Sequence, residues 1–303
     1  MILYGIPYQG SKTKIAPNIV GLLPKGKRFC DLFGGGFAMS HCARLSNKWD
    51  VVLYNELNPL LPPLISDALM GAYNYNRFKP EFITREEFYK RKESDGYIKY
   101  IWSFGNSGKE YLFGADLEPL KKEAHNFVVF GTPTTHFKKV EKYVSSKDIH
   151  QRRLQFCGYF RKNKKRFDME QLERLERLEQ LERVPRFDLQ QLEQLERLQQ
   201  LERLERLQQL ERRIKITCGS YEDYVHLDGD VVYCDPPYEG TADYGASFDH
   251  SRFYDWVATR PYQVWFSSYQ GIKDFRLVWA KQIRSSLGAG NSSVNFECLY
   301  TNR

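Results

Sequence analysis

Several features that would place the chain in a special class are missing from its 303 residues. No apolar run approaches the ~18 residues that a membrane helix needs, and the longest candidate, Leu57 to Ile65, is broken by three prolines. The first residues, Met-Ile-Leu-Tyr-Gly-Ile-Pro, have neither the basic start nor the apolar stretch of a secretory signal. The six cysteines are scattered without a C-x-x-C pair, which argues against a zinc ribbon or a disulfide scaffold. We therefore expect a cytoplasmic globular protein with reduced thiols and no membrane contact.

Histidine is also scarce, and the six copies show no ligand spacing such as H-E-x-x-H, so we expect no metal. The sequence is nevertheless rich in core-forming residues, since 42% are hydrophobic and 15% are aromatic. A chain of this length and composition can form one large domain or two ordinary ones.

Positive charge is concentrated in one segment. Between Lys138 and Lys165 there are ten lysines or arginines against two acids, whereas the whole chain carries a net charge of +7. The segment also contains four aromatic residues, Tyr143, Phe156, Tyr159 and Phe160. Basic and aromatic side chains together suit a polyanion whose flat bases can stack. The alternative is a solvated basic loop that binds no partner.

A repeat follows the basic segment. Arg166-Phe167-Asp168 recurs as Arg186-Phe187-Asp188, and each copy opens a run of Leu-Glu-Arg or Leu-Gln-Gln triplets. The composition favours helix, but a three-residue leucine spacing winds around a helix and forms no coiled-coil stripe. We interpret residues 166–213 as a low-complexity helical surface insert. The alternative is a helical arm that packs on the domain or contacts DNA or a protein partner.

A glycine loop lies between two predicted strands. Phe29–Phe33 is predicted as a buried strand that leads into Gly34-Gly35-Gly36 and then a helix. The next strand, Val51–Asn55, ends at Glu56, 20 residues beyond the last glycine of the loop. A nucleotide-binding α/β sheet typically contains this order of elements: a strand, a glycine turn, a helix and a second strand with an acid at its end. The loop is neither G-x-G-x-x-G nor a P-loop, and the carboxylate of Asp31 favours a cationic or zwitterionic ligand over a phosphate. The pattern indicates a nucleoside cofactor.

A second motif follows the predicted strand Val231–Cys234: the tetrad Asp235-Pro236-Pro237-Tyr238. Two prolines remove two amide donors and leave rigid carbonyl acceptors. A carboxylate and a carbonyl can accept both hydrogens of an exocyclic amine, which leaves its lone pair free to attack an electrophilic methyl group. The ring of Tyr238 can stack on a base that has left its helix. The alternative is a Pro-Pro strand exit with a surface tyrosine.

In this order the motifs resemble those of the Dam-type (D12 class, alpha group) DNA adenine N6-methyltransferases. The resemblance covers residues 1–70 and 215–303 and, more loosely, Ser103-Phe104-Gly105-Asn106. The matching segments are Tyr8–Lys12, Asp31–Gly36, Glu56–Asn58, Asp235–Tyr238, Trp265–Tyr269 and Asn295–Tyr300.

The resemblance implies S-adenosylmethionine as the methyl donor and N6 of a flipped adenine as the acceptor. The cofactor would be bound by Tyr8, Lys12, Asp31, Phe33, Gly34, Gly36, Glu56 and Asp235. Asp235 and the Pro236 carbonyl would hold the amine, Pro237 and Tyr238 would complete the catalytic set, and Phe248 or Tyr244 would close over the base. N4-cytosine methylation stays open, because the same tetrad can serve either amine. An inactive DNA-binding scaffold is the alternative from another class.

The resemblance also implies a mostly parallel, doubly wound, Rossmann-like methyltransferase sheet. We expect residues 1–64 and 214–303 to form the catalytic domain and 65–165 to form a helical target-recognition subdomain. Val264–Ser267 and Asn295–Tyr300 should also be strands. We expect a monomer that binds double-stranded DNA, encoded by a bacterium or phage, alone or with a restriction partner. The expected DNA contacts are Lys109, Tyr111, Lys138, Lys139, Arg161 and Lys162, with Ser107 as a further candidate.

Overall fold

The computed structural model describes residues 2–74, 78–160, 203–210, 213–239, 248–269, 271–284 and 294–303. Contacts divide the chain into two compact units. Unit 1 comprises Met1–Ile6, Gly10–Leu69 and Leu207–Arg303, and unit 2 comprises Pro7–Gln9 and Met70–Arg206. This division follows contacts alone, so the functional partition into residues 65–165 and 166–213 stays a prediction. Within the ranges given above, no helix is both long and apolar enough to span a membrane.

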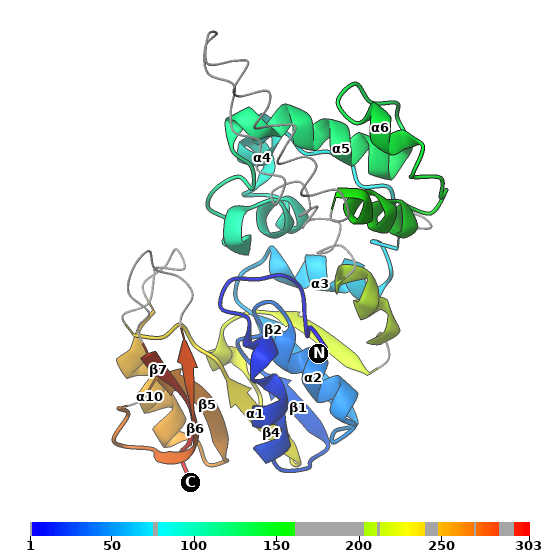
Figure 1. Ribbon diagram of the computed structural model, residues 1–303. Coiled ribbons are helices and arrows are strands. Elements are labelled where there is room, and N and C mark those ends of the chain that lie inside the picture. The colour runs from blue at the N-terminus through cyan, green and yellow to red at the C-terminus, as the bar shows by residue number, and fades with distance from the viewer. Residues whose placement is uncertain are drawn as a thin grey trace. The chain divides into compact units, whose positions relative to one another are not determined.

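Unit 1 is built on a seven-stranded sheet with the order β3-β2-β1-β4-β5-β7-β6 (Figure 1). In chain order the strands are β1 (Arg28–Asp31), β2 (Val51–Glu56), β3 (Ile214–Cys218), β4 (Asp230–Cys234), β5 (Val264–Tyr269), β6 (Arg276–Arg284) and β7 (Val294–Thr301). Neighbours from β3 to β5 pair in parallel, and β7 is antiparallel to both β5 and β6. The sheet confirms the predicted mostly parallel, doubly wound fold.

Helices cover both faces of this sheet, as central parallel strands require. On one face α1 (Ala16–Leu22) and α2 (Ala38–Ser46) pack through apolar residues against β1, β2, β4 and β5. On the other face α10 (His250–Thr259) contributes Phe253, Trp256 and Val257. The strands β1, β4 and β5 are buried almost throughout, which explains why they were the easiest to find in the sequence. A further helix of this unit, α3 (Leu61–Leu69), contacts β2 and β3.

The five strands predicted from the sequence are all present. The first is shorter than predicted, because β1 ends at Asp31 and residues Leu32 and Phe33 already belong to the loop. The strand ends there because the chain turns between its neighbours. The amide of Leu32 donates to the Tyr233 carbonyl, and that of Gly34 donates to the Asn55 carbonyl.

Unit 2 is helical. Its elements are α4 (Arg85–Arg91), the π-helical turn η2 (Tyr97–Ile101), the 3-10 turns η3 (Phe104–Asn106) and η4 (Ala115–Leu117), α5 (Glu118–Phe130) and α6 (Lys138–Glu141). Residues 149–160 are also helical. Helix α4 begins where a capping box forms, since the Thr84 hydroxyl accepts from the Glu87 amide and the Glu87 carboxylate accepts from the Thr84 amide.

Most of the leucine repeat lies outside the described residues. Its described end is helical over residues 203–207 and continues into η5 (Gln208–Leu210). Leu207 and Leu210 are buried, and η5 packs against α2 and α3 of unit 1. The last triplets are therefore part of a core and not a free surface arm.

Candidate active site

The strand order of unit 1 reverses at β1 and β4, and in open α/β sheets ligands bind at the carboxyl ends of the strands beside such a reversal. Three carboxylates lie at this edge. Asp31 ends β1, Glu56 ends β2, and Asp235 follows β4 by one residue. The sheet thus brings together three acids that the sequence had assigned to cofactor binding.

The glycine loop is fixed tightly between β1 and β2. A Cβ on Gly34 would lie 2.2 Å from a ring carbon of Tyr54, so only glycine fits there. The Tyr54 hydroxyl donates to the Gly35 carbonyl over 2.8 Å, and the Gly35 amide donates to the Glu56 carboxylate over 2.7 Å. The Gly36 carbonyl accepts from the Ile6 amide. These bonds give the loop one defined shape beside the acids.

Asp31 is a buried carboxyl group with one oxygen unsatisfied. Its exposed fraction is 1%, and Oδ2 accepts a hydrogen bond of 2.7 Å from the Ser40 hydroxyl. Oδ1 is buried and has no hydrogen-bond partner among the described residues. Burial, with smaller contributions from Asp235 and Glu56, raises the pKa of Asp31 to about 7. A buried acceptor of this kind is stabilised by a donor with a positive charge.

Glu56 is held by backbone amides. Its Oε2 accepts from Gly35 and its Oε1 accepts from Asn58 over 2.9 Å. Burial raises its pKa above the ordinary carboxyl value, although these amide bonds oppose the shift. Carboxylate oxygens have further lone pairs, so Glu56 can accept additional hydrogen bonds from hydroxyl groups.

The tetrad forms a four-residue cluster with the N-terminal segment and with β7. Lys12, in η1 (Lys12–Lys14), places Nζ 3.0 Å from Asp235 Oδ1 and 3.2 Å from Glu297 Oε1. The Tyr238 hydroxyl donates to Asp235 Oδ1 over 3.1 Å and also to Glu297 Oε1. Two donors are therefore shared between two carboxylates.

Burial and charge act in opposite directions in this cluster. Burial by itself would lower the pKa of Lys12, but Asp235 and Glu297 outweigh it and raise that pKa above the ordinary lysine value. Burial raises the pKa of Asp235 and of Glu297, since the charge of Lys12 compensates only in part. The cluster can accept hydrogen bonds from an amine or bind a positive charge.

The tetrad is also held in position from its outer side. Lys12 Nζ lies 4.4 Å from the centroid of the Tyr238 ring, and the Tyr238 and Tyr269 rings pack in a T-shaped arrangement with their centroids 4.6 Å apart. The Pro237 carbonyl accepts from the imidazole Nε2 of His250 over 2.8 Å. His250 opens α10, which begins there because the Asp249 side chain caps it by accepting from the Arg252 amide.

The remaining predicted cofactor and base contacts lie in different places. Phe33 belongs to an aromatic cluster with Tyr221 and Phe248, at ring distances of 5.2 and 5.8 Å. Tyr8 belongs to unit 2, where its ring contacts Tyr100. Tyr244 lies outside the described residues.

The predicted DNA contacts differ in how far their side chains are exposed to solvent. Lys109 and Lys138 are exposed in unit 2, and Ser107 is half-buried. Tyr111 is 4% exposed and donates its hydroxyl to the Ile83 carbonyl, so its ring is a core element and not a free surface for a base. Arg161 and Lys162 lie outside the described residues, and so does the side chain of Lys139.

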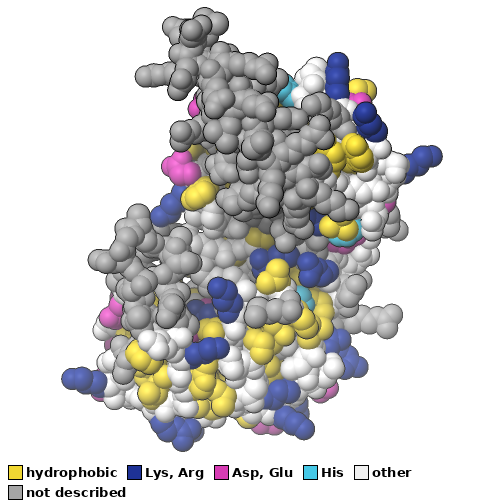
Figure 2. Space-filling view, in the orientation of Figure 1, with side chains coloured by type: hydrophobic (Ala, Val, Ile, Leu, Met, Phe, Trp, Pro, Cys, Tyr) yellow, Lys and Arg dark blue, Asp and Glu magenta, His cyan; other side chains and the backbone are white. Residues whose placement is uncertain are grey.

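The aromatic residues of the basic segment need a similar correction. Phe156 and Phe160 are buried and contact Phe137, so they are not available to stack on a base. Tyr143 is 59% exposed. Figure 2 shows lysine and arginine side chains projecting around α6, at the start of this segment.

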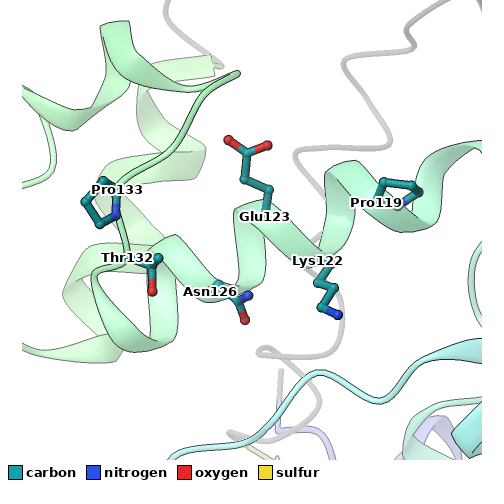
Figure 3. A pocket seen from close by; sticks show the side chains of 6 residues that line it. All are labelled: Pro119, Lys122, Glu123, Asn126, Thr132 and Pro133. Atoms are coloured by element: carbon teal, nitrogen blue, oxygen red, sulfur yellow. The ribbon is translucent and has the colours of Figure 1, made fainter.

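A cavity of about 240 Å³ lies on unit 2 between α5 and the segment that follows it (Figure 3). It is lined by Pro119, Lys122, Glu123, Asn126, Thr132 and Pro133. None of the predicted site residues lines it. In the part of the chain that the structure describes, no group of three or more His, Cys, Asp or Glu side chains could hold a metal ion.

Two residues of the site were not identified from the sequence. Glu297 lies in the matched final strand but had no assigned role, and His250 was not considered. The signal for Glu297 was available, because it is the one acid between Val294 and Thr301 of an otherwise largely apolar strand.

The comparisons with known proteins identify a family. No curated protein matched the chain. A family model described as D12 class N6 adenine-specific DNA methyltransferase matches residues 8–255, which include the glycine loop, the tetrad and all of unit 2 except Pro7. Methyltransferases of this family transfer a methyl group from S-adenosylmethionine to N6 of adenine in DNA. The chain belongs to the D12 class of N6 adenine-specific DNA methyltransferases.

Proposed function

We propose that the edge of the sheet formed by Asp31, Glu56 and Asp235 binds S-adenosylmethionine and the target adenine of this DNA methyltransferase. The observation that carries this proposal is the cluster around Asp235, in which a partly buried carboxylate follows β4 and lies 3.0 Å from Lys12. It stands beside the strand-order reversal, together with Asp31 at the end of the neighbouring strand β1 and Glu56 at the end of β2, the next strand along the sheet.

The residues fit this cofactor by charge. S-adenosylmethionine carries an ammonium and a sulfonium, and the edge offers the unsatisfied Oδ1 of Asp31 together with the carboxylates of Glu56 and Asp235. We assign Asp31 to the ammonium and Glu56 to the ribose hydroxyls. Lys12 is the described cation of the cluster and is assigned to the cofactor carboxylate. Gly34 and Gly36 allow close approach of the backbone, and Phe33 offers an apolar surface.

The tetrad positions the amine that is methylated. The bound cofactor supplies a methyl group on a positively charged sulfur. Asp235 and the Pro236 carbonyl accept hydrogen bonds from the two N6–H groups, which keeps the nitrogen lone pair free to attack the methyl carbon. As the N–C bond forms, the methyl–sulfur bond breaks and its electrons stay on the sulfur of S-adenosylhomocysteine, while N6 gives up one proton to solvent. We assign the second acceptor to Pro236 because the Pro237 carbonyl already accepts from His250. Tyr238 supplies the ring for the flipped base, and the rate gain comes from positioning and electrostatics.

Phosphate contacts come from the basic segment in this proposal. Lys138, Lys142 and Lys147 are exposed in unit 2, and lysines that contact phosphates position a protein on DNA without reading its sequence. We propose that the enzyme binds double-stranded DNA as a monomer in the cytoplasm. The logarithm of the DNA-binding constant falls linearly with the logarithm of the salt concentration. Replacing all three lysines by glutamine should make this slope less steep by about 0.9 for each phosphate contact that is lost.

The experiment that tests the proposal combines product analysis with one substitution. Unmethylated DNA of mixed sequence is incubated with the protein and S-adenosylmethionine, digested to nucleosides and analysed by mass spectrometry. We expect N6-methyladenine from the wild type and none from Asp235→Ala, with both proteins equally folded by circular dichroism. Asp228→Ala, an exposed acid, is the control. Near-normal activity of Asp235→Ala would refute the assigned site, and N4-methylcytosine as the product would refute the assigned base.

A further inference from the structure

Glu297 has no role in the mechanism given above, although it is one of the most buried acids in unit 1. It lies in β7, opposite Tyr269 of β5 and Lys281 of β6, and only 3% of it is exposed. A buried carboxylate is costly unless donors compensate it. Its position in an otherwise largely apolar strand therefore calls for a reason beyond packing.

The donors that compensate Glu297 are the same two that Asp235 uses. Lys12 Nζ lies 3.2 Å from Glu297 Oε1 and 3.0 Å from Asp235 Oδ1. The single hydrogen of the Tyr238 hydroxyl is shared between the same two oxygens. One oxygen of each carboxylate thus faces one ammonium and one hydroxyl.

This arrangement leaves Asp235 Oδ1 occupied. A carboxylate oxygen has two lone pairs, and here they meet Lys12 and Tyr238. The target amine must therefore displace at least one donor if it is to use this oxygen. Glu297 Oε1 is a second acceptor to which both donors are already bonded, so they can release Asp235 without losing their partner.

We propose that Glu297 is a positioning residue for methyl transfer, which retains Lys12 and the Tyr238 hydroxyl while the target amine binds Asp235. The inference rests on the proposed role of Asp235. Without the charge of Glu297, Lys12 would pair with Asp235 alone and compete with the amine. Glu297 contacts no reacting atom and acts through these two side chains.

Titratable and charged groups face Glu297 from several elements packed against it. They are Lys12 of η1, Asp235 and Tyr238 of the loop after β4, Tyr233 of β4, Tyr269 of β5 and Lys281 of β6. The ammonium of Lys281 is directed elsewhere, since the side chain is exposed and Nζ lies 3.5 Å from Asn18 Oδ1. Among these groups Lys12 is the cation that compensates Glu297.

The test is Glu297→Gln, which keeps the shape and the Oε1 acceptor but removes the charge. We expect the single-turnover rate of methyl transfer, at saturating S-adenosylmethionine and DNA, to fall about ten- to a hundredfold, the range seen when an orienting partner is lost. The dissociation constant for DNA should stay within about twofold, because phosphate contacts dominate it. Glu222→Gln is the matched control, since that exposed acid pairs with Arg252 outside the cluster.

The pH profile separates positioning from a purely structural role. If both carboxylates must be ionised, a plot of the logarithm of the wild-type rate against pH should have a limiting slope of about two at low pH. In Glu297→Gln only Asp235 must be ionised, so the same plot should have a slope of about one. An unchanged rate in Glu297→Gln would overturn the inference. A wild-type slope of one would also overturn it, and this measurement needs no variant if Glu297→Gln does not fold. An inactive Asp235→Ala beside a fully active Glu297→Gln would refute only this inference, whereas an active Asp235→Ala would refute the proposed site.

Discussion

Lys12 is the residue whose removal should disturb the site most, because two buried carboxylates depend on it. Its ammonium lies 3.0 Å from Asp235 and 3.2 Å from Glu297, and its side chain is only 12% exposed. Lys12→Met keeps much of the volume and removes the charge. In this variant Asp235 and Glu297 lie close to each other and to Tyr238, and no cation compensates their negative charges.

The expected loss of stability is large. Breaking a buried ion pair by removing one partner costs about 3–5 kcal/mol, because the remaining charge is buried without compensation. In a unit of this size, each kcal/mol of lost stability lowers the melting temperature by about 2–4 °C. The melting temperature of Lys12→Met should therefore lie about 6–20 °C below that of the wild type near pH 7.

The loss should depend on pH with a defined sign. Burial raises the folded-state pKa of Asp235 and of Glu297, and a raised carboxyl pKa contributes stability that is present at low pH and lost as the pH rises through it. Removing Lys12 raises both pKa values further. The difference between wild type and Lys12→Met should therefore be largest near neutrality and fall to less than about half near pH 4.5, where the carboxyl groups take up protons.

Differential scanning calorimetry of the full chain at pH 4.5, 6 and 7.5 measures this difference. Lys27→Met is the control, since that lysine is 72% exposed and its pair with Asp228, at 3.6 Å, should contribute less than about 1 kcal/mol. The reasoning is refuted if Lys12→Met is no less stable than the control. A loss that stays constant between pH 4.5 and 7.5 would also refute it.

Three further predictions concern the rest of unit 1. Gly34→Ala should destabilise the protein by about 1–3 kcal/mol, because the new methyl group would overlap the ring of Tyr54 in a tightly packed loop. Gly21→Ala is the control and should not destabilise the protein, since there is open space around Gly21. Thermal melts of the two variants measure the difference. The affinity for S-adenosylmethionine should rise as Asp31 ionises around its pKa of about 7, and calorimetric titrations of Asp31→Asn should show a flat pH dependence. Asp230→Asn should cost about 2–4 kcal/mol at pH 7, because it leaves the half-buried Arg28 without its charged partner. Burial acts to raise the pKa of Asp230, but the hydrogen bonds from Arg28, Tyr224 and the Leu227 amide together outweigh it and lower that pKa, so this cost should shrink in urea melts as the pH falls below about 4.

The motifs of the candidate site were predictable from the sequence because each is local. Asp31 and Glu56 each follow a short apolar strand, and Asp235 precedes two prolines that end another. Parallel strands bring their carboxyl ends to one edge, so strand endings alone were enough to place these acids together. The fold class and the family followed from the same segments.

Other assignments failed because composition does not report burial. Tyr111, Phe156 and Phe160 lie among basic or polar neighbours in the sequence, and their composition suggested a nucleic-acid surface. In unit 2 all three are core residues that pack against other aromatic rings, and Tyr111 lies in an isolated bridge with Ser103 and not in a helix. Which face of a short helix points inward is decided by its neighbours.

The sequence by itself determined the local units: a strand that ends in an acid, a glycine loop without room for a side chain, and a proline-bounded tetrad. Only the tertiary structure decided that Lys12 lies between Asp235 and Glu297, residues more than 200 positions away in the chain. The physical reason is that burial and Coulomb interaction depend on distance in space. The pKa values of these groups, and the donors that two carboxylates share, exist only once β7 is packed beside β5 and the N-terminal segment has closed over them.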